Sequence, residues 1–300
     1  MDFRLPRFCR AEDIRGLSIT PRDLEIVRRV ARHRFVTSRQ IARALAAPVQ
    51  PVLRRLHLLF HHGYLDRPRS QIEYFHQGGS RHMIDGLGSR AASLLTPGAG
   101  SSFRSRDRGV GRLHLRHTVL IAEVLIRIES ACTQLHNTRF IPESELRKRG
   151  AGPFHWSVGI RWDGVGRRVG VVPDAAFALE RNGDVAYYFL EADCGTMPIF
   201  RYGIGQTSFF RKLLAYASTW SQGLHRRELN VHRFRVLTVT SSTPRAAALA
   251  DAAAKLPGGH GLFLFNHLDA LAEVGLPDLL WLTPKGSRTA IVHSHDDLNT

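Results

Sequence analysis

Three carboxylates in residues 171–216 have a spacing that could hold a metal ion. Glu191 and Asp193 end an apolar run, and Asp174 follows a proline shortly before that run. Side chains alternate between the two faces of a strand, so Glu191 and Asp193 would share one face. Mg²⁺ takes one or two carboxylates together with water and phosphate oxygens. The pattern predicts a site for Mg²⁺ or Mn²⁺ made by Asp174, Glu191 and Asp193, with a solvated strand end as the alternative.

Lys212 is the cation that we expect to serve this site. Lysine is rare in the chain, since four of its 42 basic residues are lysines and the rest are arginines. An ammonium group is a compact charge with three rotatable donors, which a guanidinium does not reproduce. On a helix predicted over residues 207–221, Lys212 would stabilise charge that develops on a phosphate or orient the attacking water.

The order and spacing of these motifs carry a family resemblance. The motifs are, in order, Pro173-Asp174-Ala175, Glu191-Ala192-Asp193 with Gly195-Thr196, and Lys212 with Tyr216. Together, Pro173-Asp174, Glu191-Ala192-Asp193 and Lys212 look like the signature of the PD-(D/E)XK nuclease-like superfamily. In this order they more closely resemble the replication-relaxation family of plasmids and mobile elements, and the resemblance covers most of residues 18–240. It implies an N-terminal winged helix joined to a nuclease-like domain.

The resemblance also implies roles for individual residues. In the nuclease-like superfamily the lysine usually belongs to a Glu-x-Lys motif on one strand, whereas Asp193 stands at that position here. The resemblance therefore implies a lysine supplied from the next helix. It further implies an acidic residue from the first helix of the domain, with an exposed helical glutamate as the alternative for that residue. The implied catalytic residues are Asp174, Glu191, Asp193, Lys212 and Glu123.

The positive charge of the chain is concentrated in its N-terminal part. Residues 1–120 contain 22 Arg and Lys against 9 Asp and Glu, and residues 121–300 contain 20 against 17. This local excess indicates a polyanion partner, which we expect to be duplex DNA. No apolar run approaches the roughly 20 residues that span a bilayer. Residues 1–10 lack an export signal, and the three cysteines lack Cys-x-x-Cys spacing, so we expect a cytoplasmic protein with no membrane partner.

Two capping signals and a basic helix predict a winged helix-turn-helix domain over residues 18–95. Thr20 would cap the first helix, and Thr37 would cap a short second helix that Pro48 closes. A third helix over about residues 50–62 would pack its leucines inward and enter the major groove. A winged helix that binds protein is the alternative. The predicted DNA-binding residues are Arg39, Arg43, Arg54, Arg55, His57 and His61.

Short strands with a glycine turn predict the wing, and a closing helix follows at residues 89–95. The strands are expected at residues 64–67, 72–76 and 82–84. The stretch 96–112 is rich in glycine, serine and arginine, which predicts a linker.

Residues 113–300 predict an α/β (α+β) domain with a mixed central sheet. A strand–helix–strand crossover makes part of such a sheet parallel. The expected order is a helix at 113–135, a three-strand meander at 154–162, 168–179 and 185–193, a helix at 207–221, a strand at 234–240, a helix at 244–256, a strand at 262–265 and a helix at 268–274.

Two functions are compatible with these patterns. In the first, a DNA-binding protein of a plasmid or mobile element acts in replication, relaxation or mobilisation, and its nuclease-like domain cuts or nicks DNA with Mg²⁺. In the alternative, a non-catalytic regulator or transcriptional repressor uses that domain as a binding platform, because a fold does not decide an activity. Other replication or mobilisation proteins would be further partners. The oligomeric state stays open, a homodimer included.

Overall fold

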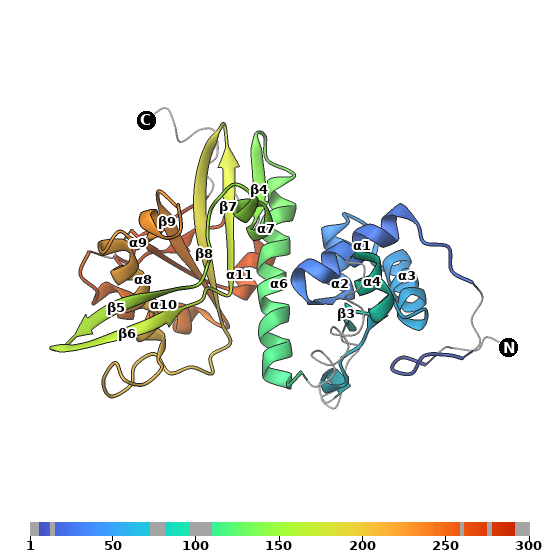
Figure 1. The fold of residues 1–300 in the computed structure, drawn as a ribbon, viewed down its shortest axis with the longest axis horizontal. Helices are drawn as coiled ribbons and strands as arrows, with labels where there is room; N and C mark the ends of the chain where they lie inside the picture. Colours follow the sequence, from blue (N-terminus) through green and yellow to red (C-terminus); the bar gives the residue numbers. More distant parts are fainter. Residues whose placement is uncertain are drawn as a thin grey trace. The chain divides into compact units, whose positions relative to one another are not determined.

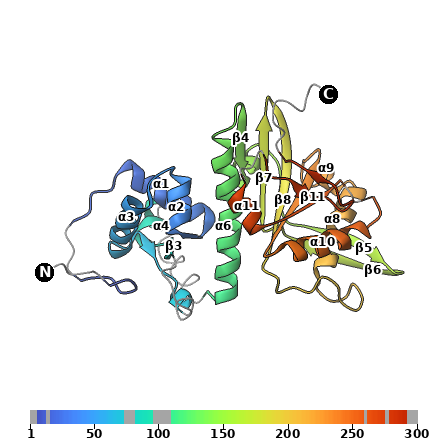
Figure 2. The same ribbon diagram turned by 180° about the vertical axis from the view of Figure 1, so that it is seen from behind.

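The computed structural model describes residues 6–12, 16–72, 82–95, 110–258, 261–274 and 278–291. The chain divides into two compact units, Met1–Ser130 and Ala131–Thr300 (Figures 1 and 2). The first unit extends further along the chain than the predicted domain 18–95, and the predicted linker 96–112 lies mostly outside the described residues. Each unit is a mixture of helices and strands, as the sequence predicts.

Three helices build the first part of unit one, and two of them begin at the predicted caps. The helices are α1 (Pro21–His33), α2 (Ser38–Ala44) and α3 (Val49–His61). Thr20 and Asp23 form a capping box on α1, and Thr37 and Gln40 form one on α2. These boxes satisfy backbone N–H groups that a helix leaves without partners in its first turn.

A small antiparallel sheet and two further helices complete the first unit. The elements are β1 (Phe35–Thr37), β2 (Leu65–Asp66), β3 (Ile84–Leu87), α4 (Ser89–Leu95) and α6 (Arg112–Cys132). The strand order β1-β3-β2 adds β1, which the sequence analysis did not predict. The last predicted strand begins at Ile84 rather than at residue 82. Residues 73–81, which include the other expected wing strand and its turn, lie outside the described residues.

Seven strands of the described residues form one mixed sheet in the second unit. In spatial order they are β12 (Arg288–Thr289), β11 (Trp281–Leu282), β10 (Phe263–His267), β9 (Phe234–Thr240), β8 (Asp184–Asp193), β7 (Ala175–Arg181) and β4 (Thr138–Pro142). β8, β9 and β10 run parallel, and the other neighbours are antiparallel. Asn182 and Gly183 join β7 to β8 with positive φ angles of 52° and 91°, as expected for this hairpin signal.

The second unit also contains helices and a separate two-stranded hairpin (Figure 1). These elements are α7 (Glu143–Lys148), β5 (Trp156–Trp162), β6 (Val165–Val171), α8 (Phe209–Ser221), α9 (Leu224–Arg227), α10 (Thr243–Ala254) and α11 (Leu268–Glu273). The hairpin packs against α8, where Trp156 donates to the Thr219 hydroxyl at 2.8 Å.

The predicted three-strand meander is wrong, because the chain leaves one sheet and enters another at Pro173. β6 ends at Val171, β7 begins at Ala175, and β6 pairs only with β5 in the part of the chain that the structure describes. Proline has no N–H group to donate, so it interrupts a ladder of hydrogen bonds. Asp174 therefore lies in the short connection between the β5–β6 hairpin and strand β7 of the large sheet.

No helix in the described ranges is long and apolar enough to cross a membrane. No disulfide bond joins the described cysteines Cys9, Cys132 and Cys194.

Candidate functional site

Glu191 is the centre of a buried carboxylate–lysine group in the second unit. It lies two residues before the end of β8 and is only 2% exposed. Its Oε2 accepts a hydrogen bond from Lys212 Nζ at 2.5 Å, and its Oε1 accepts one from the Tyr216 hydroxyl at 2.6 Å. Ser208 caps α8, the helix that carries both donors. Lys212 and Tyr216 are i and i+4 on this helix, so they lie one turn apart on the same face. The structure thus brings together the strand glutamate and the helix lysine of the sequence prediction.

Asp174 lies beside Glu191 at the start of the neighbouring strand. The antiparallel register pairs Ala175 with Leu190, so Asp174 and Glu191 stand opposite each other. The Asp174 N–H donates to the Leu190 carbonyl at 3.0 Å, and its Oδ2 accepts the Ala192 N–H at 2.8 Å. These backbone bonds hold the half-buried aspartate next to the glutamate.

Burial and neighbouring charges set the protonation of this group. Burial raises the pKa of Glu191 to about 7; the Lys212 cation opposes the shift and the Asp174 carboxylate adds to it. Burial alone lowers the pKa of Lys212, but the attraction of Glu191 and Asp174 leaves that pKa above its ordinary value. Burial and the Glu191 charge raise the pKa of Tyr216 well above its usual range. Near neutral pH, Lys212 is therefore a cation, Tyr216 is a donor and Glu191 titrates.

Asp193, the third predicted metal ligand, is held in a different buried ion pair. Its Oδ2 accepts hydrogen bonds from Arg245 Nε at 2.8 Å and from the Thr240 hydroxyl at 2.9 Å, and its Oδ1 accepts the Gly195 N–H at 3.2 Å. No three His, Cys, Asp or Glu residues of the described part of the chain gather as a set that could hold a metal ion. The predicted set of three carboxylates is therefore not assembled, because a guanidinium and a hydroxyl already bind Asp193.

Arg245 and Thr240 are site residues that the sequence analysis missed. A signal for Arg245 was present, since Ser242 and Pro244 are a helix start directly after the strand β9. The carboxyl ends of parallel strands meet at one edge of a sheet, so the helix after β9 begins near the end of β8. The ion pair follows from this topology, which the sequence alone did not supply.

Asp174 and Glu191 are the residues that could hold a divalent cation. Two carboxylates suffice for Mg²⁺, which completes its octahedron with water and phosphate oxygens. The raised pKa of Glu191 shows that a carboxylate charge is costly here, and a cation beside the pair would relieve that cost. Mg²⁺ or Mn²⁺ could use these two carboxylates if it replaced part of the bonding of Glu191 to Lys212 and Tyr216.

Glu123 is engaged elsewhere, within the first unit. Its Oε1 accepts hydrogen bonds from Arg43 Nη1 at 2.7 Å and from Arg127 Nε at 2.5 Å. The pair also accounts for Arg43, which was expected to contact DNA. Opposite charges on α2 and α6 thus bind each other, and the catalytic role of Glu123 and the DNA contact of Arg43 stay predictions.

Arg39 and Arg54 are exposed, whereas Arg55 is bound internally. Arg55 donates to the carboxylate of Asp23, which is fully buried, and to the Ser18 carbonyl at 2.7 Å. Burial raises the pKa of Asp23, but the bonds from Arg55 and Thr20 outweigh it and leave that pKa below its ordinary value. Of these three arginines, Arg39 and Arg54 remain available to a phosphate backbone.

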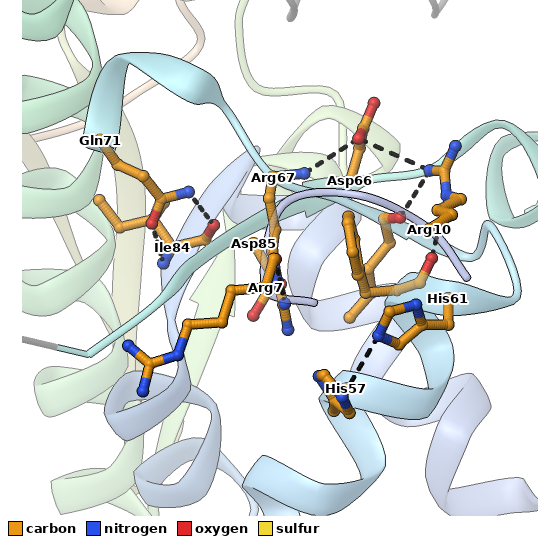
Figure 3. A network of polar contacts seen from close by, with 11 residues as sticks. Arg7, Arg10, His57, His61, Asp66, Arg67, Gln71, Ile84 and Asp85 are labelled. Carbon is orange, nitrogen blue, oxygen red and sulfur yellow. Dashed lines mark hydrogen bonds and ion pairs between the residues drawn. The ribbon is translucent and has the colours of Figure 1, made fainter. Parts of the chain in front are cut away.

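His57 and His61 belong to an internal network rather than to an exposed helix face (Figure 3). His61 is 4% exposed, its Nδ1 accepts the Ala11 N–H at 3.1 Å, and its Nε2 lies 3.2 Å from His57 Nε2. Burial lowers the pKa of His61 to about 4, and the nearby His57 lowers it further. The predicted DNA contact of His61 is wrong, because residues 6–12 lie over this end of α3 and leave the ring neutral.

The same network contains a buried ion pair, Arg67 with Asp85 (Figure 3). Arg67 Nε donates to Asp85 Oδ1 at 2.9 Å, and its Nη1 donates to the Arg7 carbonyl at 2.6 Å. The guanidinium also lies 4.2 Å from the centre of the Phe60 ring. Arg10 adds bonds to the Phe60 and Leu65 carbonyls. These contacts fasten the N-terminal segment to the small sheet and to α3.

Comparison with known proteins identifies the family of the chain. The profile of the family described as replication-relaxation matches residues 27–233, which include the second half of α1, the helices α2 and α3, the Asp174–Glu191–Lys212 group and β8. No curated protein and no solved structure matches the chain. The family match covers more than half of the chain and bears out the resemblance found in its motifs, so this protein belongs to the replication-relaxation family.

Proposed function

We propose that this protein is a replication-related DNA-binding protein of a plasmid or mobile element that cuts or nicks DNA. In this proposal unit one is a winged helix-turn-helix domain for duplex DNA, and unit two is a PD-(D/E)XK nuclease-like domain. The observation that carries the proposal is the convergence of Asp174, Glu191 and Lys212 at the end of β8. An acidic pair that could hold a metal ion, beside a lysine that could stabilise charge, suits metal-dependent phosphodiester hydrolysis.

Asp174 and Glu191 would hold Mg²⁺ or Mn²⁺, which, when bound, polarises the phosphate and lowers the pKa of a water molecule. Tyr216 donates to Glu191 Oε1 and so fixes the orientation of that carboxylate. The Lys212 side chain is 34% exposed while its ammonium group binds Glu191, so the lysine is partly accessible from solvent. At a bound phosphate it would stabilise the negative charge that develops on the transferred phosphoryl oxygens.

Charge supports the assignment of duplex DNA to the first unit. Residues 1–120 carry 22 basic against 9 acidic residues, and Arg39 on α2 and Arg54 on α3 are exposed. Contacts between such arginines and phosphates provide most of the affinity of non-specific DNA binding, and they make it depend on salt.

One observation favours the second candidate, a non-catalytic DNA-binding regulator. Both carboxylate oxygens of Glu191 already accept strong hydrogen bonds, and Asp193 is bound by Arg245. A metal ion would have to displace part of this arrangement. In that case the second unit would serve as a platform for DNA or for a partner protein.

Cleavage and metal-dependent melting of the full-length protein separate the two candidates. We expect cleavage of at least one of supercoiled, linear, single-stranded or branched DNA with Mg²⁺ or Mn²⁺, and a higher melting temperature with the metal. Asp174→Asn should remove both responses. Lys212→Ala should remove cleavage and keep the melting shift, because its role is charge stabilisation.

Two exposed residues of the same unit provide matched controls. Lys148→Ala on α7 and Asp251→Asn on α10 remove the same groups away from the site and should leave both responses unchanged. If the wild-type protein cleaves none of these substrates and shows no metal-dependent shift, the nuclease proposal is wrong and the regulator stands in its place.

A further inference from the structure

A surface hollow of about 570 Å³ is formed mainly by the loop 194–208. This loop follows β8 along the chain and leads into α8. Among the residues that line it are Thr196, Phe200, Arg201, Tyr202, Gln206 and Arg245. Arg245 joins the hollow to the site, because it also binds Asp193. The loop ends at Ser208, which caps the helix that carries Lys212. A ligand in this hollow would therefore contact Arg245, the partner of Asp193 at the end of β8.

The loop is held in place at several points. Arg245 donates to the Met197 carbonyl at 2.5 Å, and two other arginines donate to the Gly205 carbonyl. The Pro198 carbonyl accepts a hydrogen bond from the first turn of α8, and the Ile204 side chain is buried in the core of the unit. A loop anchored in this way presents its remaining side chains in fixed positions, so a ligand would not need to order it.

Two aromatic rings of this anchored loop point away from the core. Tyr202 has a relative exposure of 101%, and Phe200 is 46% exposed. The Phe200 ring is nevertheless held, since it packs on Phe210 at 5.0 Å between ring centres and has Lys255 Nζ 4.7 Å from its own centre. The Tyr202 ring is therefore accessible to a ligand, on a loop of the kind that often carries binding residues.

The charge around these rings is positive. The residues that line the hollow include Arg201 and Arg245 and no Asp or Glu. Arg201 is exposed and makes no hydrogen bond or ion pair within the described part of the chain. Alternation of aromatic and basic side chains, Phe200-Arg201-Tyr202, offers ring faces for bases and a guanidinium for a phosphate. A phosphodiester strand is complementary to both.

We infer that this hollow binds an unpaired segment of a DNA strand, with a base stacked on Tyr202 and a phosphate on Arg201. Bases within a duplex are already stacked on each other, so an exposed ring of this kind selects bases that have lost their partners. The inference rests on the proposed function and deepens it. It names the substrate of the second unit as DNA with a single-stranded region, such as a nick edge, a bubble or a branch.

Binding of a fluorescent 12-nucleotide thymidine strand by the full-length protein in EDTA tests this inference. We expect Tyr202→Ala to weaken binding about 5- to 100-fold, the loss typical of one stacking ring. Tyr202→Phe keeps the ring and should bind within about twofold of the wild type. Arg161→Ala on β5 removes an exposed arginine outside the hollow and serves as the charge control for Arg201→Ala. The affinity for a blunt duplex should stay unchanged in the tyrosine variants.

Photocrosslinking locates the strand independently of affinity. A strand with 5-iododeoxyuridine should crosslink to Tyr202, and trypsin should release the adduct on the peptide 202–211, because arginines flank it. A crosslink confined to residues of the first unit, or equal strand affinity of Tyr202→Ala and wild type, would overturn the inference.

The outcomes of this test and of the cleavage test are distinguishable. If Tyr202→Ala weakens strand binding while the wild type cleaves nothing, the strand site stands and the nuclease proposal falls. If Lys212→Ala removes cleavage while Tyr202→Ala changes neither strand binding nor cleavage, the nuclease proposal stands and the strand site falls.

Discussion

Each unit contains a buried ion pair, and the two pairs differ in their surroundings. In the first unit, Arg67 and Asp85 have side chains that are 5% and 1% exposed. Arg67 also binds the Arg7 carbonyl and lies over the Phe60 ring. Burial raises the pKa of Asp85, and the guanidinium opposes that shift. This pair connects the N-terminal segment, the small sheet and α3, which is a structural role.

In the second unit, the side chain of the cation is partly exposed and a second carboxylate lies near the pair. Lys212 is 34% exposed, and Asp174 stands opposite Glu191 across two strands. Burial raises the pKa of Glu191 to about 7, and the nearby Asp174 carboxylate adds to the shift. The comparison teaches that a buried pair alone does not indicate function. A partly exposed lysine beside a second carboxylate is an arrangement that suits metal binding or catalysis.

Loss of the arginine in the first unit should have the largest effect on stability. Arg67→Ala leaves Asp85 buried without its cation, so we expect the free energy of unfolding to fall by about 3–5 kcal/mol. Urea denaturation followed by circular dichroism measures the change. Arg54→Ala on the exposed face of α3 is the control, expected within about 0.5 kcal/mol of wild type. A loss below about 1 kcal/mol for Arg67→Ala would contradict the structural role.

The glutamate of the second unit should make stability depend on pH. Its pKa is raised from 4.5 to about 7 in the folded protein, so its contribution is fully present below pH 4.5 and is lost as pH rises through 7. Relative to Glu191→Gln, wild type should lose up to about 3 kcal/mol of unfolding free energy between pH 4.5 and pH 8. Denaturation at a series of pH values measures this difference. Glu228→Gln removes an exposed glutamate and should show no such trend.

Removal of the Asp174 charge should have a smaller effect, which is a change in the pKa of Glu191. Asp174→Asn removes the like charge and keeps an oxygen that can accept the Ala192 N–H, so the pKa of Glu191 should fall below about 7. Carbon-detected NMR of the glutamate carboxyl group in EDTA measures the shift. An unchanged or higher pKa would show that burial alone sets it, and the proposed carboxylate pair would lose its support.

The smallest effects are expected on the exposed arginines of the first unit. Arg39→Ala and Arg54→Ala should each weaken duplex binding by less than about tenfold and reduce the salt slope by about 1. Arg55→Ala should instead cost about 1–3 kcal/mol of stability, because it leaves the buried Asp23 without its main partner. Equal salt slopes for wild type and Arg54→Ala would remove that residue from the DNA surface.

Local signals in the sequence predicted many elements correctly. Thr20 and Thr37 cap their helices because their hydroxyl groups satisfy N–H groups three residues away, which is a property of adjacent residues. Asn182 and Gly183 form the turn between β7 and β8 for a similarly local reason, since both residues tolerate a positive φ angle. The meander failed because hydrophobic alternation continues across Pro173 and does not say which sheet each strand joins.

The sequence by itself determined the family, the caps, the main hairpin and the residue types of the candidate site, because these depend on order and spacing along the chain. Only the tertiary structure decided which charges meet. Lys212 binds Glu191, whereas Arg245 binds Asp193 and Arg55 binds Asp23. The physical reason is that packing brings the two side chains of an ion pair together from distant segments of the chain. The residues adjacent to either side chain in the sequence do not indicate which partner it will bind.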